Sequence, residues 1–330
     1  MANDEASARP APAPPGLWTP GPDARSTTRL GAFWDRCESR AGLVFDDYEE
    51  LWSWSVGDGL EECWAAIWEH FDVVASVPYE RVLGGRDMPG ARWFEGARLN
   101  YAEHLVRHAR RGDVAIVGRS QSRDRIELTW DELVDQVGRA RAGLVRLGVG
   151  PGDRVAAYLP NVPETIVAFI AAASLGAIWT SCAPEFGVQA VLDRFTQVEP
   201  TVLLAVDGYR YGRHQVSRVG ELAAIRAGLP SLDTTVLLPY GDAPNHLADE
   251  RMTSWDDLVA EPGQQVDHAN DIGVPTRARR GFSEHPIEDH GRLLCAGGCL
   301  QRGHPLLLVP LLDGLQRLHQ LRGQHLRGVA

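Results

Sequence analysis

The stretch Tyr158–Gly187, YLPNVPETIVAFIAAASLGAIWTSCAPEFG, decides the fold. Its middle part is opened by Asn161 and Pro163, closed by Gly176 and apolar nearly all round, which predicts a buried helix. The run RVAAYL at 154–159, before this helix, and the run AIWTSC at 177–182, after it, predict two strands. We expect AIWTSC to be a buried central strand of a sheet. The loop Ala183–Gly187 then leaves the carboxyl edge of that sheet, where open parallel sheets bind ligands. Every such sheet has several of these loops, so its position alone does not make this loop a site.

The same alternation of strands and helices continues on both sides of this stretch. The runs VAIVG at 114–118 and RIELT at 125–129 flank a polar turn and predict a hairpin. Thr129 and Glu132 form a capping box that opens the next helix. The run TVLLAV at 201–206 predicts a further strand. We therefore expect an α/β fold with a mainly parallel sheet flanked by helices.

Tryptophan is concentrated upstream of this pattern. Within DGLEECWAAIWEHF, Asp58 and Glu61 have the spacing of a capping box, with Asp in place of the usual Ser or Thr. Apolar residues from Leu60 to Phe71 then recur on one face of a helix. An aromatic ligand cage is one interpretation, but the helical spacing favours core packing of an N-terminal helical layer. The tryptophans of this region are Trp34, Trp52, Trp54, Trp64, Trp68 and Trp93.

Composition and charge restrict the class of protein. The chain has 330 residues, 44% hydrophobic and 23% charged, as in an ordinary globular protein of one large or two smaller domains. Its net charge of -11 argues against nucleic-acid and anionic-membrane partners. No apolar run approaches the roughly 20 residues that cross a bilayer, and the N-terminus lacks the pattern of a signal peptide. Five cysteines, an odd number, fit reduced thiols and a cytoplasmic location. We expect Cys182 to be an inert buried thiol.

The chain contains no lysine, so its 33 basic side chains other than histidine are all arginine. Arginine does not lose its proton at working pH. Schiff-base and lysine-acid chemistry are therefore excluded for these 330 residues.

Three segments carry a resemblance to a known family: residues 91–105, ARWFEGARLNYAEHL, residues 158–195, which begin with the stretch quoted first, and residues 203–212, LLAVDGYRYG. They resemble acetoacetate–CoA ligase (acetoacetyl-CoA synthetase), of the adenylate-forming superfamily that includes acyl-CoA synthetases and luciferases. The resemblance runs from about Phe33 to about Pro262. IWTSCAPEFG and VDGYRYG look like the acetoacetate branch of the family.

The resemblance implies a two-step reaction with ATP, acetoacetate, CoA and Mg²⁺. ATP and the carboxylate give an acyl-adenylate and pyrophosphate, and the CoA thiol then releases AMP and forms the thioester. In related acetate ligases an arginine pair at the positions of Arg210 and Arg213 contacts the phosphates of CoA, as paired guanidinium groups can do. Without the resemblance, these two residues read as solvated surface arginines. Weaker candidates for lining the acyl or pantetheine channel are Trp179, Pro184, Glu185, Phe186 and Gly187.

The resemblance also implies parts that this sequence does not show. Past Asp257 the family continues into a Ser/Thr/Gly-rich loop with a lysine, which wraps the ATP phosphates. That loop, the later acidic magnesium contacts and the lysine of a small C-terminal domain are missing, so we assign no catalytic residue. We expect an incomplete adenylate-forming large domain without ligase activity. The alternatives are a non-catalytic CoA-binding fragment, or a protein that associates with full-length ligase through an exposed sheet edge.

The chain divides into four predicted parts: a disordered tail at 1–25, a Trp-rich helical region at 26–100, a truncated AMP-binding domain at 101–265 and an atypical, irregular tail at 266–330. The abrupt change of composition suggests a frame interruption near Gln265–Arg280. This last part contains His290, Cys295, Cys299 and His304, a set that zinc accepts. Because structural zinc sites use tighter pairs in a compact knuckle, we assign no metal site.

Overall fold

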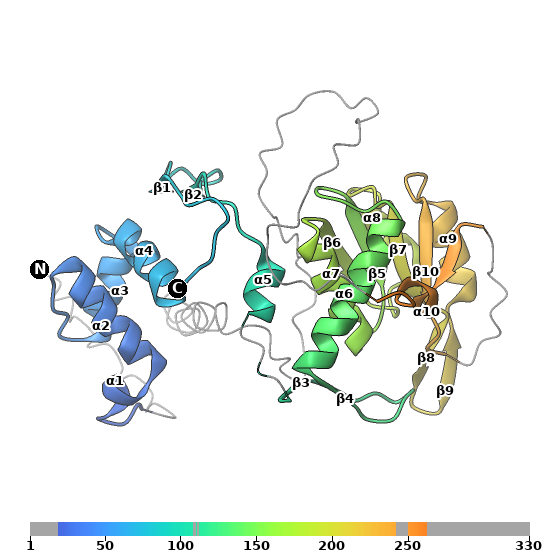
Figure 1. The fold of residues 1–330 in the computed structure, drawn as a ribbon, viewed down its shortest axis with the longest axis horizontal. Helices are drawn as coiled ribbons and strands as arrows, with labels where there is room; N and C mark the ends of the chain where they lie inside the picture. Colours follow the sequence, from blue (N-terminus) through green and yellow to red (C-terminus); the bar gives the residue numbers. More distant parts are fainter. Residues whose placement is uncertain (1–18, 108–109, 111, 242–249, 263–330) are drawn as a thin grey trace, which may run out of the picture. The chain divides into compact units, whose positions relative to one another are not determined.

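The computed structural model describes residues 19–107, 110, 112–241 and 250–262 (Figure 1). The expected irregular tail at 266–330 and its histidines and cysteines lie outside the described residues. The helices are α1 (Ala24–Thr27), α2 (Arg29–Ala41), α3 (Tyr48–Val56), α4 (Leu60–His70), α5 (Tyr101–Val106), α6 (Trp130–Arg146), α7 (Pro163–Ser174), α8 (Val188–Phe195), α9 (Val219–Ala227) and α10 (Trp255–Leu258). The strands are β1 (Arg81–Leu83), β2 (Trp93–Glu95), β3 (Val114–Gly118), β4 (Ile126–Thr129), β5 (Arg154–Tyr158), β6 (Ile178–Cys182), β7 (Val202–Val206), β8 (Gly208–Tyr211), β9 (His214–Ser217), β10 (Thr234–Leu238) and β11 (Met252–Ser254).

A five-stranded parallel sheet lies at the centre of the second part of the chain, in the order β11-β10-β7-β5-β6. The α/β class with a parallel sheet flanked by helices is therefore confirmed. The expectation that AIWTSC is a central strand is wrong: within the described residues β6 lies at one edge and pairs with β5 alone. Its place follows from which strands pair in three dimensions, and the local apolar pattern of a strand does not encode that order.

Alternate residues of each strand point to opposite faces of the sheet. Both faces are apolar, and helices cover both of them. On one face, residues such as Ala157 and Leu204 pack with α6, α7 and α10. On the other face, Ala156, Tyr158 and Leu203 pack with α8 and α9. β5 and β7 are buried on both faces, as expected for the centre of a parallel sheet.

Three short antiparallel hairpins, β1–β2, β3–β4 and β8–β9, accompany this sheet. The β3–β4 hairpin and the capping box of α6 are both confirmed: Thr129 accepts a hydrogen bond from the Glu132 amide, and the Glu132 carboxylate accepts one from the Thr129 amide. The capping box expected at Asp58 and Glu61 is wrong. α4 begins one residue later than that box requires, at Leu60, and Gly59 is its N-cap. No helix of the described residues is long and apolar enough to cross a membrane.

The N-terminal helices α1–α4 hold a smaller core of their own, with Trp34, Cys37 and Leu51 among its buried residues. Aromatic rings of α4 contact the rings of the segment that follows, with Trp64 against Trp93 and Trp68 against Phe94 at centroid distances of 4.8 and 4.6 Å. The apolar stripe from Leu60 to Phe71 is half-buried and lies outside the core cluster, and the buried residues of α4 are instead Cys63, Ala65 and Ala66. The rings pack against one another, and core packing of this stripe stays a prediction.

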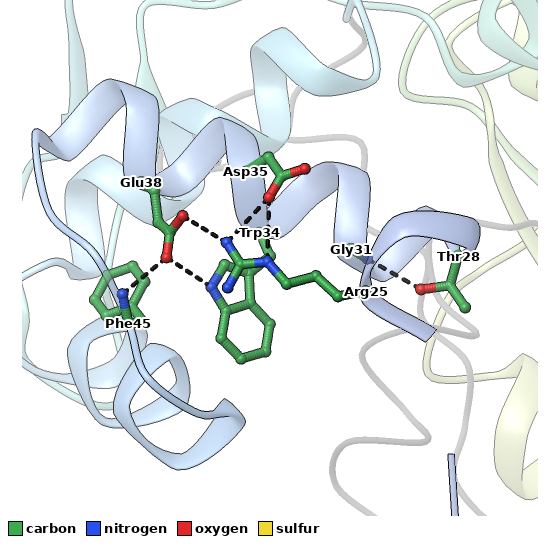
Figure 2. Close-up of polar contacts among 7 residues, drawn as sticks. All are labelled: Arg25, Thr28, Gly31, Trp34, Asp35, Glu38 and Phe45. Atoms are coloured by element: carbon green, nitrogen blue, oxygen red, sulfur yellow. Dashed lines mark hydrogen bonds and ion pairs between the residues drawn. The ribbon is translucent and has the colours of Figure 1, made fainter. Parts of the chain in front are cut away.

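Charged side chains also hold this N-terminal region together (Figure 2). The described chain starts at residue 19, within the segment 1–25 expected as a tail, and Arg25 lies in α1. Its guanidinium binds Asp35 at 3.0 Å and Glu38 at 2.5 Å and lies over the Trp34 ring. Glu38 also accepts hydrogen bonds from the Trp34 indole at 3.0 Å and from the Phe45 amide at 2.8 Å.

Candidate functional site

The carboxyl ends of four parallel strands meet at one edge of the sheet. Register aligns Tyr158 of β5 with Cys182 of β6 and with Ala205 of β7, and it aligns Val206 of β7 with Leu238 of β10. The loop Ala183–Gly187 follows β6, the β8–β9 hairpin follows β7, and further segments follow β5 and β10. This is the edge where parallel sheets bind their ligands.

The loop Ala183–Gly187 is fixed by side chains from two other elements. The Tyr158 hydroxyl lies 2.7 Å from the carbonyl oxygens of both Pro184 and Phe186, and its single proton serves one of them at a time. The Arg218 Nε–H donates to the same Pro184 carbonyl at 2.7 Å. Burial raises the pKa of Tyr158 to about 12, although the Arg218 charge acts the other way. The phenol therefore stays protonated and keeps its donor at neutral pH.

The β8–β9 hairpin carries the arginine pair. Arg210 lies in β8, which follows β7, Arg213 lies in the turn, and both are exposed. The turn requires Gly212, whose φ of 59° lies in the left-handed region that favours glycine. Both guanidinium groups thus stand on one rigid hairpin at the edge of the sheet.

The loop between β3 and β4 supports this hairpin. The Gly212 amide donates to Gln121 Oε1 at 2.7 Å, and the Arg210 amide donates to Ser122 Oγ at 3.1 Å. The neighbouring Arg123 donates to the Pro239 carbonyl after β10 at 2.7 Å. The β3–β4 loop therefore joins the arginine hairpin to the end of β10.

A buried carboxylate completes the edge. Asp207, the residue after β7, is 4% exposed, and its Oδ1 accepts hydrogen bonds from the amides of Tyr240 and Gly241 at 2.8 and 2.7 Å. Gly208, next in the chain, cannot carry a side chain, since a Cβ there would lie 2.5 Å from the Val216 carbonyl oxygen. These contacts set where the β8–β9 hairpin leaves the sheet.

The structure brings some of the expected site residues together and separates one. Pro184 is buried, Phe186 is half-buried beneath the Arg194 guanidinium at 5.0 Å, and Glu185 and Gly187 are exposed on the same loop. Trp179 packs elsewhere: its ring meets Phe169 of α7 at 6.0 Å, within the apolar cluster on the opposite face of the sheet from Tyr158.

Sequence reasoning missed several residues of the edge, namely Tyr158, Asp207 and Arg218 and the β3–β4 loop residues Gln121, Ser122 and Arg123. Tyr158 follows three apolar residues of β5, and a polar hydroxyl at the carboxyl end of such a strand was a usable signal. Arg218 precedes α9, and its contacts with Pro184 and Tyr209 depend on tertiary structure.

The thiol and metal chemistry of the described residues is limited. Cys182 is buried, and burial raises the pKa of its thiol, with Arg194 acting in the opposite direction. This fits an inert thiol, because the thiolate is the reactive form. Within the residues that the structure covers, no three or more His, Cys, Asp or Glu side chains are grouped as metal ligands. The chemistry that the edge offers is instead the binding of anionic oxygens by guanidinium groups.

Comparisons with known families agree with this arrangement. The family model described as AMP-binding enzyme matches residues 103–274, and the model described as acetyl-coenzyme A synthetase N-terminus matches residues 48–105. The first match contains the whole parallel sheet and the β8–β9 hairpin.

Individual relatives agree with the family matches. The chain is 41% identical over 230 residues to an acetoacetyl-coenzyme A synthetase of Rhizobium meliloti (strain 1021), and 38% identical over 229 residues to an acetoacetyl-CoA synthetase of Macaca fascicularis. These alignments cover 69% and 68% of this chain but 34% and 33% of the relatives. A solved acetoacetyl-CoA synthetase from Streptomyces lividans superimposes with a TM-score of 0.71 at 42% identity, over 76% of this chain and 39% of that one. The chain thus spans about a third of the length of the curated relatives it matches.

Proposed function

Because the chain belongs to the AMP-binding enzyme family, we propose that its parallel sheet is the CoA-binding part of an acetoacetate–CoA ligase. In that reaction the carboxylate of acetoacetate attacks the α-phosphorus of ATP, which forms acetoacetyl-adenylate and expels pyrophosphate. The sulfur of CoA then attacks the acyl carbon and loses its proton, so that acetoacetyl-CoA forms and AMP leaves. The observation that carries the proposal is the placement of the arginine hairpin and the loop Ala183–Gly187 at one edge of the sheet.

The arginine hairpin is suited to the phosphates of CoA. Arg210 and Arg213 remain charged at every working pH and offer planar forks of N–H donors. Both are exposed on a hairpin whose backbone is fixed by Gln121 and Ser122, so the backbone loses little conformational entropy when a phosphate binds, and the entropy cost falls on the two side chains. In a protein with net charge -11, this local pair attracts an anion that the chain as a whole repels.

The loop Ala183–Gly187 is suited to the rest of the ligand. We propose that it guides the pantetheine arm or the acyl group, with the half-buried Phe186 ring as its apolar element and Glu185 and Gly187 on its exposed side. Trp179 is a weaker part of this proposal, because its ring packs against Phe169.

We propose further that these 330 residues do not complete the ligase reaction by themselves. The sequence contains no lysine and no Ser/Thr/Gly-rich phosphate loop. Each catalytic donor of this kind contributes about 3–4 kcal/mol to transition-state stabilisation. ATP, acetoacetate and Mg²⁺ belong to the proposal as family substrates and cofactor, and no magnesium ligand is assigned among the described residues. The reduced thiols suit a cytoplasmic setting for this chemistry.

Calorimetric titration of the purified chain with CoA tests the proposal. We expect binding that falls at least about tenfold when Arg210 and Arg213 are both changed to Gln, because two charge-assisted contacts are lost. Arg139→Gln is the matched control: Arg139 is on α6, and its guanidinium pairs with Asp135 on the same helix. If wild-type chain shows no CoA binding, or if the control weakens it as much as the double variant, the proposal is wrong. Acetoacetate-dependent AMP formation by the chain alone would refute the proposal that these 330 residues do not complete the ligase reaction.

One observation favours a second function. Within the described residues β6 pairs on one side only, and an edge strand can pair with a strand of another chain. Association with a full-length acetoacetate–CoA ligase through β6 is therefore the alternative. Size-exclusion chromatography of an equimolar mixture of this chain and a full-length ligase tests the alternative. The alternative requires that the two proteins co-elute and that Ser181→Pro in β6 abolishes the co-elution.

A further inference from the structure

Arg218 contacts both segments of the proposed CoA site. Its Nε–H donates to the Pro184 carbonyl in the loop Ala183–Gly187 at 2.7 Å. Its Nη2 donates to the Tyr209 hydroxyl in β8 at 3.1 Å, and its guanidinium lies 5.3 Å from the centre of the Tyr209 ring. One side chain therefore joins the loop that follows β6 to the hairpin that carries the arginine pair.

Arg218 is itself held in one position. Its Nη1 donates to Glu221 Oε1 of α9 at 2.5 Å, and its backbone amide donates to the Asp207 carbonyl at 2.7 Å. The side chain is only 15% exposed. A guanidinium that is partly buried and bonded to a carbonyl, a phenol and a carboxylate has little freedom to turn toward a ligand.

We propose that Arg218 is a positioning residue that fixes the loop Ala183–Gly187 relative to the arginine hairpin, so that one CoA molecule can occupy both segments at once. This inference rests on the proposed function. Arg218 touches no reacting atom in this role. It acts through Pro184 on one side and Tyr209 on the other.

The chemistry of CoA makes such a link consequential. CoA joins a phosphorylated nucleotide to a thiol through the flexible pantetheine arm, so its two ends are bound by different segments. When both segments are held in a fixed relation, binding of one end raises the effective concentration of the other end at its own segment. When the link is broken, each segment keeps its own contacts, but the whole ligand loses this advantage.

Tyr158 holds the same loop from the side of β5. Its hydroxyl lies 2.7 Å from the Pro184 and Phe186 carbonyls, and the phenol is 0% exposed. Pro184 thus receives donors from Tyr158 and from Arg218. Tyr158 fixes the loop to the sheet, whereas only Arg218 also reaches Tyr209 of the hairpin.

The test compares whole CoA with its nucleotide half, adenosine 3′,5′-bisphosphate, by calorimetric titration. In Arg218→Gln we expect affinity for CoA to fall about tenfold, while affinity for adenosine 3′,5′-bisphosphate stays within about twofold of wild type. Arg218→Lys keeps the charge but loses the planar fork, so we expect it to restore less than half of the lost binding free energy. Tyr209→Phe removes one acceptor of the link and should show a weaker form of the same pattern.

The outcomes are distinguishable from failure of the proposed function. If wild-type chain does not bind CoA, the proposed CoA site is wrong. If wild type binds CoA but Arg218→Gln weakens CoA and the bisphosphate equally, or leaves both unchanged, the positioning role is wrong. Thermal denaturation of each variant checks folding. Should Arg218→Gln fail to fold, Tyr209→Phe takes its place, and the loss of affinity for CoA is compared with the loss for the bisphosphate. An equal effect of Tyr209→Phe on both ligands overturns the inference. Arg139→Gln is again the control.

Discussion

The parallel sheet and the N-terminal helices are stabilised by different means. In the sheet, β5 and β7 bury nearly every side chain, and two large apolar clusters lie on its faces. The N-terminal helices share one small cluster, and their connections include half-buried rings and ion pairs such as those of Arg25 and Glu38. Apolar burial scales with area and tolerates pH, whereas hydrogen-bonded charges depend on their protonation state. The two regions should therefore fail under different perturbations.

The largest expected effect is a cavity in the sheet. Leu204 is 1% exposed and lies in β7, between Ala157 of β5 and Val236 of β10. We expect Leu204→Ala to lower the free energy of unfolding by about 3–4 kcal/mol, because neighbouring strands cannot close over the lost volume. Leu51→Ala in α3, at a residue 4% exposed in the small cluster, should cost about 2 kcal/mol. Urea denaturation measures both, and equal losses would break the contrast between the regions.

Alkali should destabilise the sheet region through Tyr158. The pKa of Tyr158 is raised from 10.0 to about 12, chiefly by burial, so the fold favours the protonated phenol. Its contribution is fully present below pH 10, is lost as pH rises from 10 to 12, and amounts to roughly 2–3 kcal/mol. Lysine, which titrates in the same range, is absent from the chain. Urea midpoints between pH 8 and 11.5 should fall more steeply in wild type than in Tyr158→Phe; parallel curves would contradict the assignment.

Acid should destabilise the N-terminal helices through Glu38. The amide of Phe45 and the Arg25 and Trp34 side chains hold the pKa of Glu38 below its ordinary value. A lowered pKa gives stability above the ordinary carboxyl value of about 4.3, and that stability is lost as pH falls through the lowered value. Near-ultraviolet circular dichroism of the tryptophans should show a step below about pH 4.

Glu38→Gln is the matched variant for this acid step. It keeps the shape of the side chain and removes its titration, so the step should disappear while the tryptophan signal at pH 7 shifts toward the acid form. A step that survives in Glu38→Gln would contradict the assignment of the acid transition to Glu38.

How far the sequence predicts the fold depends on how local each feature is. The periodicities of the strand β5 and the helix α7 depend on neighbouring residues, and the structure confirms them. The edge position of β6 depends on strand pairing, which the local pattern does not encode. At the candidate site, the sequence indicated the arginines of β8–β9 and the loop after β6. It did not indicate Arg218, because the contacts of Arg218 are with Pro184, distant along the chain, and with Tyr209 of β8.

The smallest expected effects concern the two capping boxes predicted from the same spacing, one in each region. Thr129 and Glu132 form theirs at α6, with hydrogen bonds between 2.8 and 3.3 Å. Asp58 does not cap α4, because Gly57 and Gly59 both donate their amides to the Trp54 carbonyl and the helix begins after this turn. A Cβ at Gly59 would also lie 2.0 Å from the Trp54 ring, so the turn is fixed by that contact.

Thr129→Ala should therefore lower the free energy of unfolding by about 1 kcal/mol, because the amide of Glu132 loses its acceptor at the start of the longest helix described. Thr129→Ser keeps a hydroxyl and should recover most of that loss. Asp58→Ala should change stability by less than about 0.5 kcal/mol, as an exposed residue without a capping role. Urea denaturation of the three variants decides the point. A loss in Asp58→Ala as large as that in Thr129→Ala would mean that spacing alone forms the box and that the turn at Gly59 does not exclude it.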